Sequence, residues 1–588
     1  MRGRRAAAFS ALAAATALLF VISRGKWSDA IIDSGREWIV PDALSRGALL
    51  YRDVVYWFGP FTPYFQAGFL GLFGSGFAAL VLAGAVAALG VLAALFSTLV
   101  RVTGRKDAGL WTALAVPALL FMPNAGGAFL GMGYRIWQAA GFTLASVAVA
   151  SSGGGSRRPT RAVVAGALAG LAGLCRTEWG MAAMLATGLA AILRPRARAR
   201  GAAEALLAAS GFAAVFGGGL ALFLWLAGPQ AVVGDGHVLL TGLPEETRHF
   251  LVAFSGVADW KRGVLELFYS AAMWTGLFLL AARLSVPAGT RARGLEVALV
   301  AILVVLVATA LAGGAGGAVI FSAAPLVSFA ALAGGLWRRR GSAAAALAAS
   351  GVLGVLLSYR RPFHIGDSAY VGPPLLFAFV SSAGLLRLAV AYRRRLPGIH
   401  GLRAAFRWVI AALLLLAFAG RAWQYSSLEG VPIAGTSKML SARPEVAREV
   451  EQLGSRIRQS TREGEGLVVF PEGELLNLLA ERPNPIRHKL YLPGYLTDGN
   501  EADVLRELES ARPAAIVLWR RPVPEYGRAL FGEDYGRSLR AWIEREYRLE
   551  PFRADGAPNR THPAFLLGLR RRSPGSLGSA REMGYPSE

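Results

Sequence analysis

Residues 77–106 read FAALVLAGAVAALGVLAALFSTLVRVTGRK: an apolar run without charge up to Val100, then a basic loop. As an α-helix, at about 1.5 Å per residue, an uncharged run of this length reaches across the hydrocarbon core of a bilayer. The apolar residues are continuous rather than alternating, which favours a helix over a strand of a closed barrel. The segment therefore predicts a membrane span that ends in a basic loop.

The same pattern of an apolar run followed by a basic loop repeats along the chain. The further basic loops are SSGGGSRRPTR after Ala150, RPRARARG after Leu193, RLSVPAGTRARG after Ala282, WRRRG after Leu336 and AYRRRLPGIHGLR after Val390. Between each pair there is room for a helical hairpin, so all these loops fall on one side of the membrane, as the positive-inside rule requires. We predict a polytopic α-helical membrane protein with about 13 spans.

The composition excludes several other classes of protein. Of the 588 residues, 54% are hydrophobic and only 17% are charged, whereas soluble domains carry about a quarter charged residues. The formal net charge of +24 comes from arginines in short loops, and no aromatic-and-basic module accompanies it, so we expect no nucleic-acid partner. The single cysteine, Cys175, excludes an intrachain disulfide and a thiolate zinc cluster.

The two ends of the apolar region set its predicted orientation. The chain starts with MRGRR and an apolar run, Ala6–Ile22, which resembles a signal peptide but is interpreted as a retained first helix with a cytoplasmic N-terminus. The last span, about Phe406–Trp423, then runs outward. We predict a multi-pass protein of the cell (inner) membrane with a transmembrane domain (1–425), an extracytoplasmic or periplasmic domain (426–572) and a disordered tail (573–588).

The predicted C-terminal domain has an α/β pattern. GLVVF (Gly466–Phe470) and AAIVLW (Ala514–Trp519) are typical of short buried strands, and helical patterns such as PEVAREVEQLGSRI alternate with them. This order favours a small α/β domain with a partly parallel sheet. Its acids form no convincing catalytic constellation, so we expect it to cap a cavity or to help hold an acceptor.

The first outward loop holds the main candidates for chemistry. Asp29, Asp33 and Glu37 are spaced four apart and share one face of a predicted helix, with Arg36 beside it. Three stacked acids repel one another and raise at least one pKa, which suits a general base or a metal ligand. The spacing permits a divalent metal without requiring one, and we predict no required cofactor. A solvated acidic helix is the alternative.

Further charged residues lie on the same predicted outer side. Arg176 and Glu178 interrupt two apolar runs, which is costly unless they line a polar cavity or form a buried ion pair. Arg135 begins another span. Arg360, Arg361 and His364 form a basic cluster that fits either phosphate binding or interfacial anchoring.

The run DSGREW followed by LSRGALLYRDVVYWFGPFTPYFQAGFLGLFG resembles the first outward loop of the GT-C superfamily of membrane glycosyltransferases. This group includes glycosyltransferase family 39, the protein O-mannosyltransferases and the aminoarabinose transferases. The matching positions are Asp33, Glu37, Gly47, Tyr51-Arg52-Asp53, Gly59-Pro60 and Phe73-Gly74. Asp33 is followed by Ser34 rather than by a second acid, and Gly59 replaces a proline, so the resemblance does not extend to the substrate of any one subfamily.

The resemblance implies a polyprenyl-phosphate sugar donor and an acceptor hydroxyl on a glycan, lipid or protein. It implies that Asp33 acts as general base with Glu37 as a second catalytic acid, and that configuration is inverted on transfer of a hexosyl or pentosyl group. The substrate-binding candidates are Tyr51, Asp53, Arg135, Arg176, Glu178, Arg360, Arg361 and His364.

Two other functions remain open at this point. A transporter or lipid flippase requires charges at the membrane midplane and related halves, and neither is clear in this sequence. An O-antigen ligase or polymerase also uses lipid-linked sugars, but such enzymes place their basic residues in one large late loop.

Overall fold

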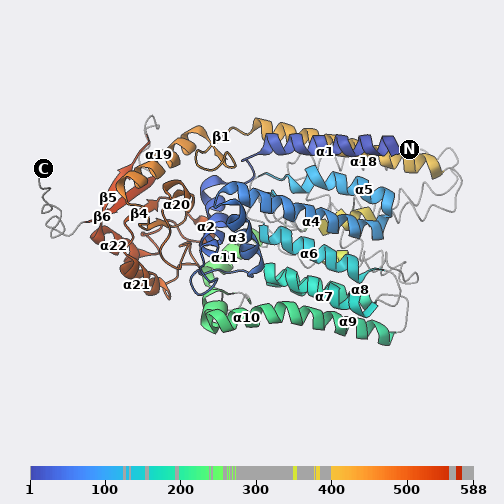
Figure 1. Ribbon diagram of the computed structural model, residues 1–588, viewed down its shortest axis with the longest axis horizontal. Coiled ribbons are helices and arrows are strands. Elements are labelled where there is room, and N and C mark those ends of the chain that lie inside the picture. Colours follow the sequence, from blue (N-terminus) through green and yellow to red (C-terminus); the bar gives the residue numbers. More distant parts are fainter. Residues whose placement is uncertain are drawn as a thin grey trace, which may run out of the picture.

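In a computed structural model of the protein, a bundle of long helices is followed at one end by a region built around a β-sheet (Figure 1). The described residues are 2–123, 127–130, 134–152, 158–192, 198–237, 239, 243–255, 399–554 and 564–571, with short pieces between 261 and 384. The predicted tail and most of the spans predicted between residues 256 and 398 lie outside them.

The bundle consists of long apolar helices. Its described members include α1 (Arg2–Ser23), α4 (Phe77–Thr103), α5 (Arg105–Ala115), α6 (Tyr134–Ala150), α7 (Arg158–Cys175), α8 (Thr177–Ile192), α9 (Arg198–Phe212), α10 (Gly218–Ala227) and α18 (Ile399–Ser427). Among the described residues, two helical stretches, Phe77–Thr103 and Gly201–Ala227, are by themselves long and apolar enough to cross a membrane. The total of about 13 spans stays a prediction.

The first and last predicted spans lie within α1 and α18, which run side by side (Figure 1). Just after α1, the Lys26 Nζ donates hydrogen bonds to the carbonyl oxygens of Tyr425 (2.7 Å) and Leu428 (2.9 Å) at the end of α18. These bonds join the start of the chain to the beginning of the C-terminal region, by which we mean the residues after α18.

Small residues let the bundle helices approach closely. A Cβ atom at Gly166 of α7 would lie 1.8 Å from the carbonyl oxygen of Ala208 in α9, and one at Gly180 of α8 would lie 2.4 Å from the Cα of Gly173. Such contacts are typical of helices packed within a membrane, where dispersion at close range replaces the hydrophobic effect.

Shorter helices lie between the bundle and the sheet: the π-helical turn η1 (Ala30–Ser34), α2 (Gly35–Ser45), α3 (Phe61–Phe73) and α11 (Glu245–Ser255) (Figure 1). The predicted row of three acids on one helix face is wrong for Asp29. Its carboxylate instead caps η1 by accepting hydrogen bonds from the backbone N–H groups of Ile31 (2.9 Å) and Ile32 (2.7 Å), a role that aspartate favours at a helix start.

The sheet of the C-terminal region has the strand order β3-β4-β6-β5. Its elements are α19 (Pro444–Ser460), β3 (Leu467–Phe470), α20 (Leu475–Ala480), α21 (Glu501–Ala511), β4 (Ala515–Trp519), α22 (Arg537–Glu546), β5 (Tyr547–Phe552) and β6 (Phe565–Arg570), preceded by a small ladder of β1 (Val431–Pro432) and β2 (Ser441–Ala442). The parallel pairing of β3 with β4 confirms the predicted partly parallel sheet, and the other pairs are antiparallel. β5 and β6 were not predicted. β5 is an edge strand, where a proline such as Pro551 is tolerated.

The two faces of this sheet enter different cores. On β3, Leu467 and Val469 join the apolar core of the helix bundle, whereas Val468 and Phe470 join a second core inside the C-terminal region. This alternation follows from the period of two along a strand. Because one core runs from the bundle into the sheet, the C-terminal region is packed against the bundle rather than tethered to it.

Candidate active site

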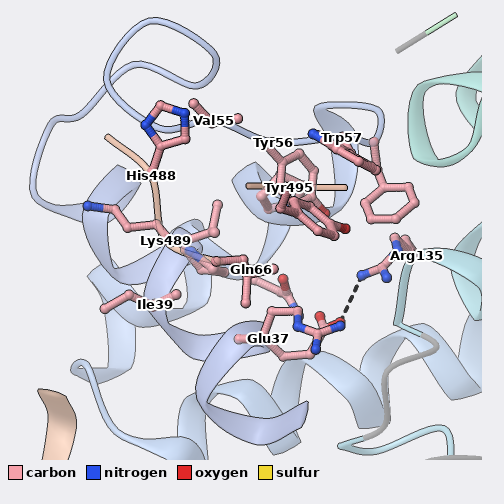
Figure 2. A pocket seen from close by; sticks show the side chains of 16 residues that line it. Glu37, Ile39, Val55, Tyr56, Trp57, Gln66, Arg135, His488, Lys489 and Tyr495 are labelled. Atoms are coloured by element: carbon pink, nitrogen blue, oxygen red, sulfur yellow. Dashed lines mark hydrogen bonds and ion pairs between the residues drawn. The ribbon is translucent and has the colours of Figure 1, made fainter. Parts of the chain in front are cut away.

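A pocket lies where α2, α3, the start of α6 and the C-terminal region meet (Figure 2). It holds about 620 Å³ of empty space, counting the part open to solvent. The lining side chains are Arg36, Glu37, Ile39, Val40, Pro41, Val55, Tyr56, Trp57, Phe58, Pro63, Gln66, Arg135, His488, Lys489, Leu490 and Tyr495. Two segments more than 400 residues apart in sequence therefore share one cavity wall.

A buried ion pair closes one side of this pocket. The Arg135 Nη1 donates a hydrogen bond of 2.9 Å to the Glu37 Oε1, and both side chains are almost fully buried (Figure 2). Burial raises the pKa of Glu37, while the charge of Arg135 acts in the opposite direction. The structure thus brings together two of the predicted site residues, one from α2 and one from α6.

The ring of Phe58 lies close to two guanidinium groups. The Arg135 Cζ is 3.8 Å from the ring centroid, and the Arg176 Cζ is 5.1 Å from it. Arg176 also forms an ion pair of 2.6 Å with Glu178 at the break between α7 and α8. The predicted residues Arg135 and Arg176 thus meet at one aromatic ring, which favours cations through its quadrupole, and Glu178 is bound to Arg176.

Asp33 lies one helical turn before the pocket wall and is buried, with 7% of its surface exposed. Burial raises the pKa of its carboxyl group to about 7, against the lowering effect of Arg36. Among the described residues, no side chain forms a hydrogen bond or ion pair with this carboxylate. An acid of this kind exchanges protons near neutral pH, as a general base must.

Arg36, the next charged residue, points to the C-terminal region. Its Nη2 donates a 2.8 Å hydrogen bond to the Oε2 of Glu472, and the other carboxylate oxygen lies 2.7 Å from the Arg521 Nη1 in an ion pair. The Glu472 side chain is fully buried. One acid of the C-terminal region thus binds two arginines, one of which belongs to α2.

The opposite wall of the pocket comes from the C-terminal region (Figure 2). Tyr495 stacks on Trp57 with 3.9 Å between ring centroids and 17° between planes. Lys489 is buried and donates hydrogen bonds to the carbonyl oxygens of Asn484 (2.9 Å) and Ile486. Burial lowers the pKa of Lys489 to about 8. This wall therefore lines the pocket with the aromatic ring of Tyr495 and with a lysine whose amino group is bound to backbone carbonyls.

Four of the predicted substrate contacts, Arg176, Glu178, Tyr51 and Asp53, lie outside the pocket lining. The Tyr51 hydroxyl is buried and donates a 2.6 Å hydrogen bond to the carbonyl oxygen of Phe58. Asp53 pairs with the exposed Arg52 and accepts a hydrogen bond from the Leu49 N–H. Both residues hold the loop that carries Phe58, and their contact with substrate stays a prediction.

The remaining predicted residues, Arg360, Arg361 and His364, lie outside the described residues. Within the part of the chain that the structure describes, no group of three His, Cys, Asp or Glu side chains is placed to hold a metal ion. The sequence interpretation missed Glu472, Lys489 and Tyr495. The available signal was Arg487-His488-Lys489, three consecutive basic residues in a region otherwise interpreted as an ordinary soluble domain.

The structural neighbours of this chain are GT-C glycosyltransferases, the group that its first outward loop resembles, and they imply the polytopic helical membrane fold that the apolar runs predicted. ArnT from Cupriavidus metallidurans bound to undecaprenyl phosphate superposes with a TM-score of 0.52 and 13% identity over 95% of this chain and 96% of that chain. The apo state of the same protein superposes with a TM-score of 0.52 and 12% identity, over 96% of this chain and 98% of that chain.

A second kind of neighbour is the archaeal oligosaccharyltransferase AglB from Archaeoglobus fulgidus, in complex with an inhibitory peptide and a dolichol-phosphate. It matches with a TM-score of 0.48 and 13% identity over 87% of this chain and 69% of that chain. No family model and no curated protein sequence matches this chain.

Proposed function

We propose that this protein is a membrane glycosyltransferase that moves a sugar from a polyprenyl phosphate to an acceptor hydroxyl at the extracytoplasmic surface. The observation that carries the proposal is the placement of Asp33, a buried carboxylate with a pKa near 7, one turn from a pocket lined by Arg36 and the buried Arg135. The fold shared with ArnT, whose structure contains undecaprenyl phosphate, supports the class of donor.

In the proposed reaction, Asp33 accepts the proton of the acceptor hydroxyl as the oxygen attacks the anomeric carbon. The new bond joins that oxygen to the sugar, and the bond between the sugar and the phosphate oxygen breaks. The polyprenyl phosphate leaves with the electron pair, so a direct displacement inverts the configuration. A base with a pKa near the working pH is the most efficient for this step.

The leaving phosphate gains negative charge in the transition state and requires cations that are already in place. Arg135 and Arg176, which both lie against the ring of Phe58, are the proposed partners, since a guanidinium group can bind two phosphate oxygens at once. Arg360, Arg361 and His364 complete the proposed set of phosphate contacts. Tyr51, Asp53, Glu37 and Glu178 are proposed to shape and orient the site.

The test compares the wild-type protein with Asp33→Asn and with Asp42→Asn, a buried acid of α2 that pairs with Arg46 and does not line the pocket. Each detergent-purified protein is mixed with a panel of polyprenyl-phosphate sugars and examined by native mass spectrometry. We expect all three to bind one donor. After addition of an acceptor extract, Asp33→Asn should release free polyprenyl phosphate about 10²–10⁴ times more slowly than the other two.

Two outcomes contradict the proposal at different points. If the wild-type protein binds ordinary phospholipids but no sugar donor, the lipid-linked donor is excluded and transport becomes the better explanation. If Asp33→Asn releases polyprenyl phosphate at the wild-type rate, the transferase assignment stands and the base is another residue.

A further inference from the structure

Arg36 has two possible anionic partners, and the structure shows it bound to the more distant one. Asp33 precedes it by three residues, a spacing at which oppositely charged side chains on a helix normally meet. The Arg36 guanidinium is instead bonded to Glu472 at 2.8 Å. The two members of this pair are 436 residues apart in the sequence.

The topology of the sheet explains why Glu472 reaches α2. β3 and β4 are parallel, with Phe470 opposite Leu518 at their carboxyl ends. Glu472 and Arg521 follow these two ends closely, at the carboxyl ends of the parallel strand pair, where α/β proteins place their functional loops. Nothing separates this edge from α2, since a Cβ atom at Gly35 would lie only 2.3 Å from the Leu475 backbone nitrogen.

We infer that Glu472 is a positioning residue for the proposed transfer reaction: it binds Arg36 and thereby keeps the Asp33 carboxylate free to accept a proton. The inference rests on the proposed function. It makes the C-terminal region part of the catalytic apparatus, because the region supplies the anion that occupies Arg36.

The other charges that face Asp33 already have partners. The charged groups near its carboxylate are Arg36, Asp29, Glu472 and Glu37. Asp29 is occupied by backbone N–H groups, and Glu37 by Arg135. The buried Glu474 also interacts with the Arg36 charge, but after Glu472 the acid that acts most strongly on the Arg36 guanidinium is Asp33. An ion pair between them would lower the pKa of Asp33 and weaken it as a base.

The test is a double-mutant cycle on transfer activity. In Glu472→Gln, we expect the kcat at neutral pH to fall by about 10- to 100-fold, with little change in the KM for the donor. The acidic limb of the pH profile should move to lower pH, because a carboxylate paired with Arg36 loses its proton more readily. Arg36→Gln in the Glu472→Gln background should restore most of the activity, since it removes the competing cation.

The matched control is Glu525→Gln. Glu525 pairs with Arg521 at 2.7 Å on the far side of the same cluster and touches neither Arg36 nor the pocket. We expect a wild-type kcat and pH profile for this variant. If Glu472→Gln does not fold, Glu472→Asp, which keeps the charge but shortens the reach, enters the same cycle with Arg36→Gln.

The outcomes separate this inference from the proposed function. A wild-type kcat and pH profile in Glu472→Gln overturns the inference and leaves the transferase assignment intact. An activity loss that Arg36→Gln does not restore also overturns it, because Glu472 then has a purely structural role. If the wild-type protein itself transfers no sugar, the proposed function and this inference are both wrong.

Discussion

The turn η1 and the first turn of α2 are consecutive in the sequence, and each buries one acid, but the two acids have opposite surroundings. Glu37 in α2 is paired with Arg135 at 2.9 Å. Asp33 in η1 has no such partner among the described residues, and its pKa is raised to about 7. The difference separates an acid that holds helices together from one that can accept a proton.

The largest expected effect comes from breaking the paired acid. Glu37→Gln leaves the Arg135 charge buried without its anion, which should lower the free energy of unfolding by about 3–5 kcal/mol. Asp33→Asn removes a buried charge that has no ion-pair partner, so it should not lower this free energy. Denaturant unfolding of both variants in the same detergent measures the contrast, and equal losses would contradict it.

The pH dependence of stability sharpens the same comparison. The folded protein holds the Asp33 proton more tightly than the unfolded chain does, because the folded-state pKa is raised from 3.8 to about 7. The stabilisation that this bound proton gives to the folded state is therefore complete below pH 3.8, the pKa of Asp33 in the unfolded chain. It is lost as the pH rises through about 7. Between pH 5 and pH 7, wild type should lose about 1 kcal/mol of stability per pH unit relative to Asp33→Asn. Parallel pH curves for the two proteins would refute this.

The aromatic contact behind the ion pair should have a smaller effect. Phe58→Leu keeps an apolar side chain of similar size but removes the ring that faces Arg135 and Arg176. We expect a loss of about 1–2 kcal/mol in the free energy of unfolding and weaker donor binding, since both guanidinium groups become less well placed. The matched control is Phe65→Leu in α3, whose ring contacts other phenylalanines and no arginine among the described residues.

The smallest effect is expected at Asp53, which is partly exposed and pairs with an exposed arginine. Asp53→Asn should leave the melting temperature unchanged within error, as is usual for surface pairs. Donor affinity is the informative measurement here. A weaker affinity without a change in stability would establish the predicted substrate contact, and an unchanged affinity would limit Asp53 to its bond with the Leu49 N–H.

Patterns within single segments of the sequence predicted most of the described helices and strands. They did not predict which residues far apart in the sequence would pair. Apolar runs predicted α4 and the strands β3 and β4, because burial in lipid or between layers leaves a pattern within one segment. The capping role of Asp29 was missed, since spacing alone does not show where a helix begins. The Arg36–Glu472 pair was not predictable, because each residue on its own has the pattern of an ordinary surface charge.

The 436-residue separation between Arg36 and Glu472 also has a consequence for synthesis. Arg36 leaves the ribosome early, whereas its partner follows only after the last described helix of the bundle. If Glu472 keeps Arg36 away from Asp33 as inferred, a nascent or truncated chain that ends before residue 472 has Asp33 paired with Arg36. Asp33 is then a weak base. The order of translation would then keep an unfinished enzyme from consuming lipid-linked sugar.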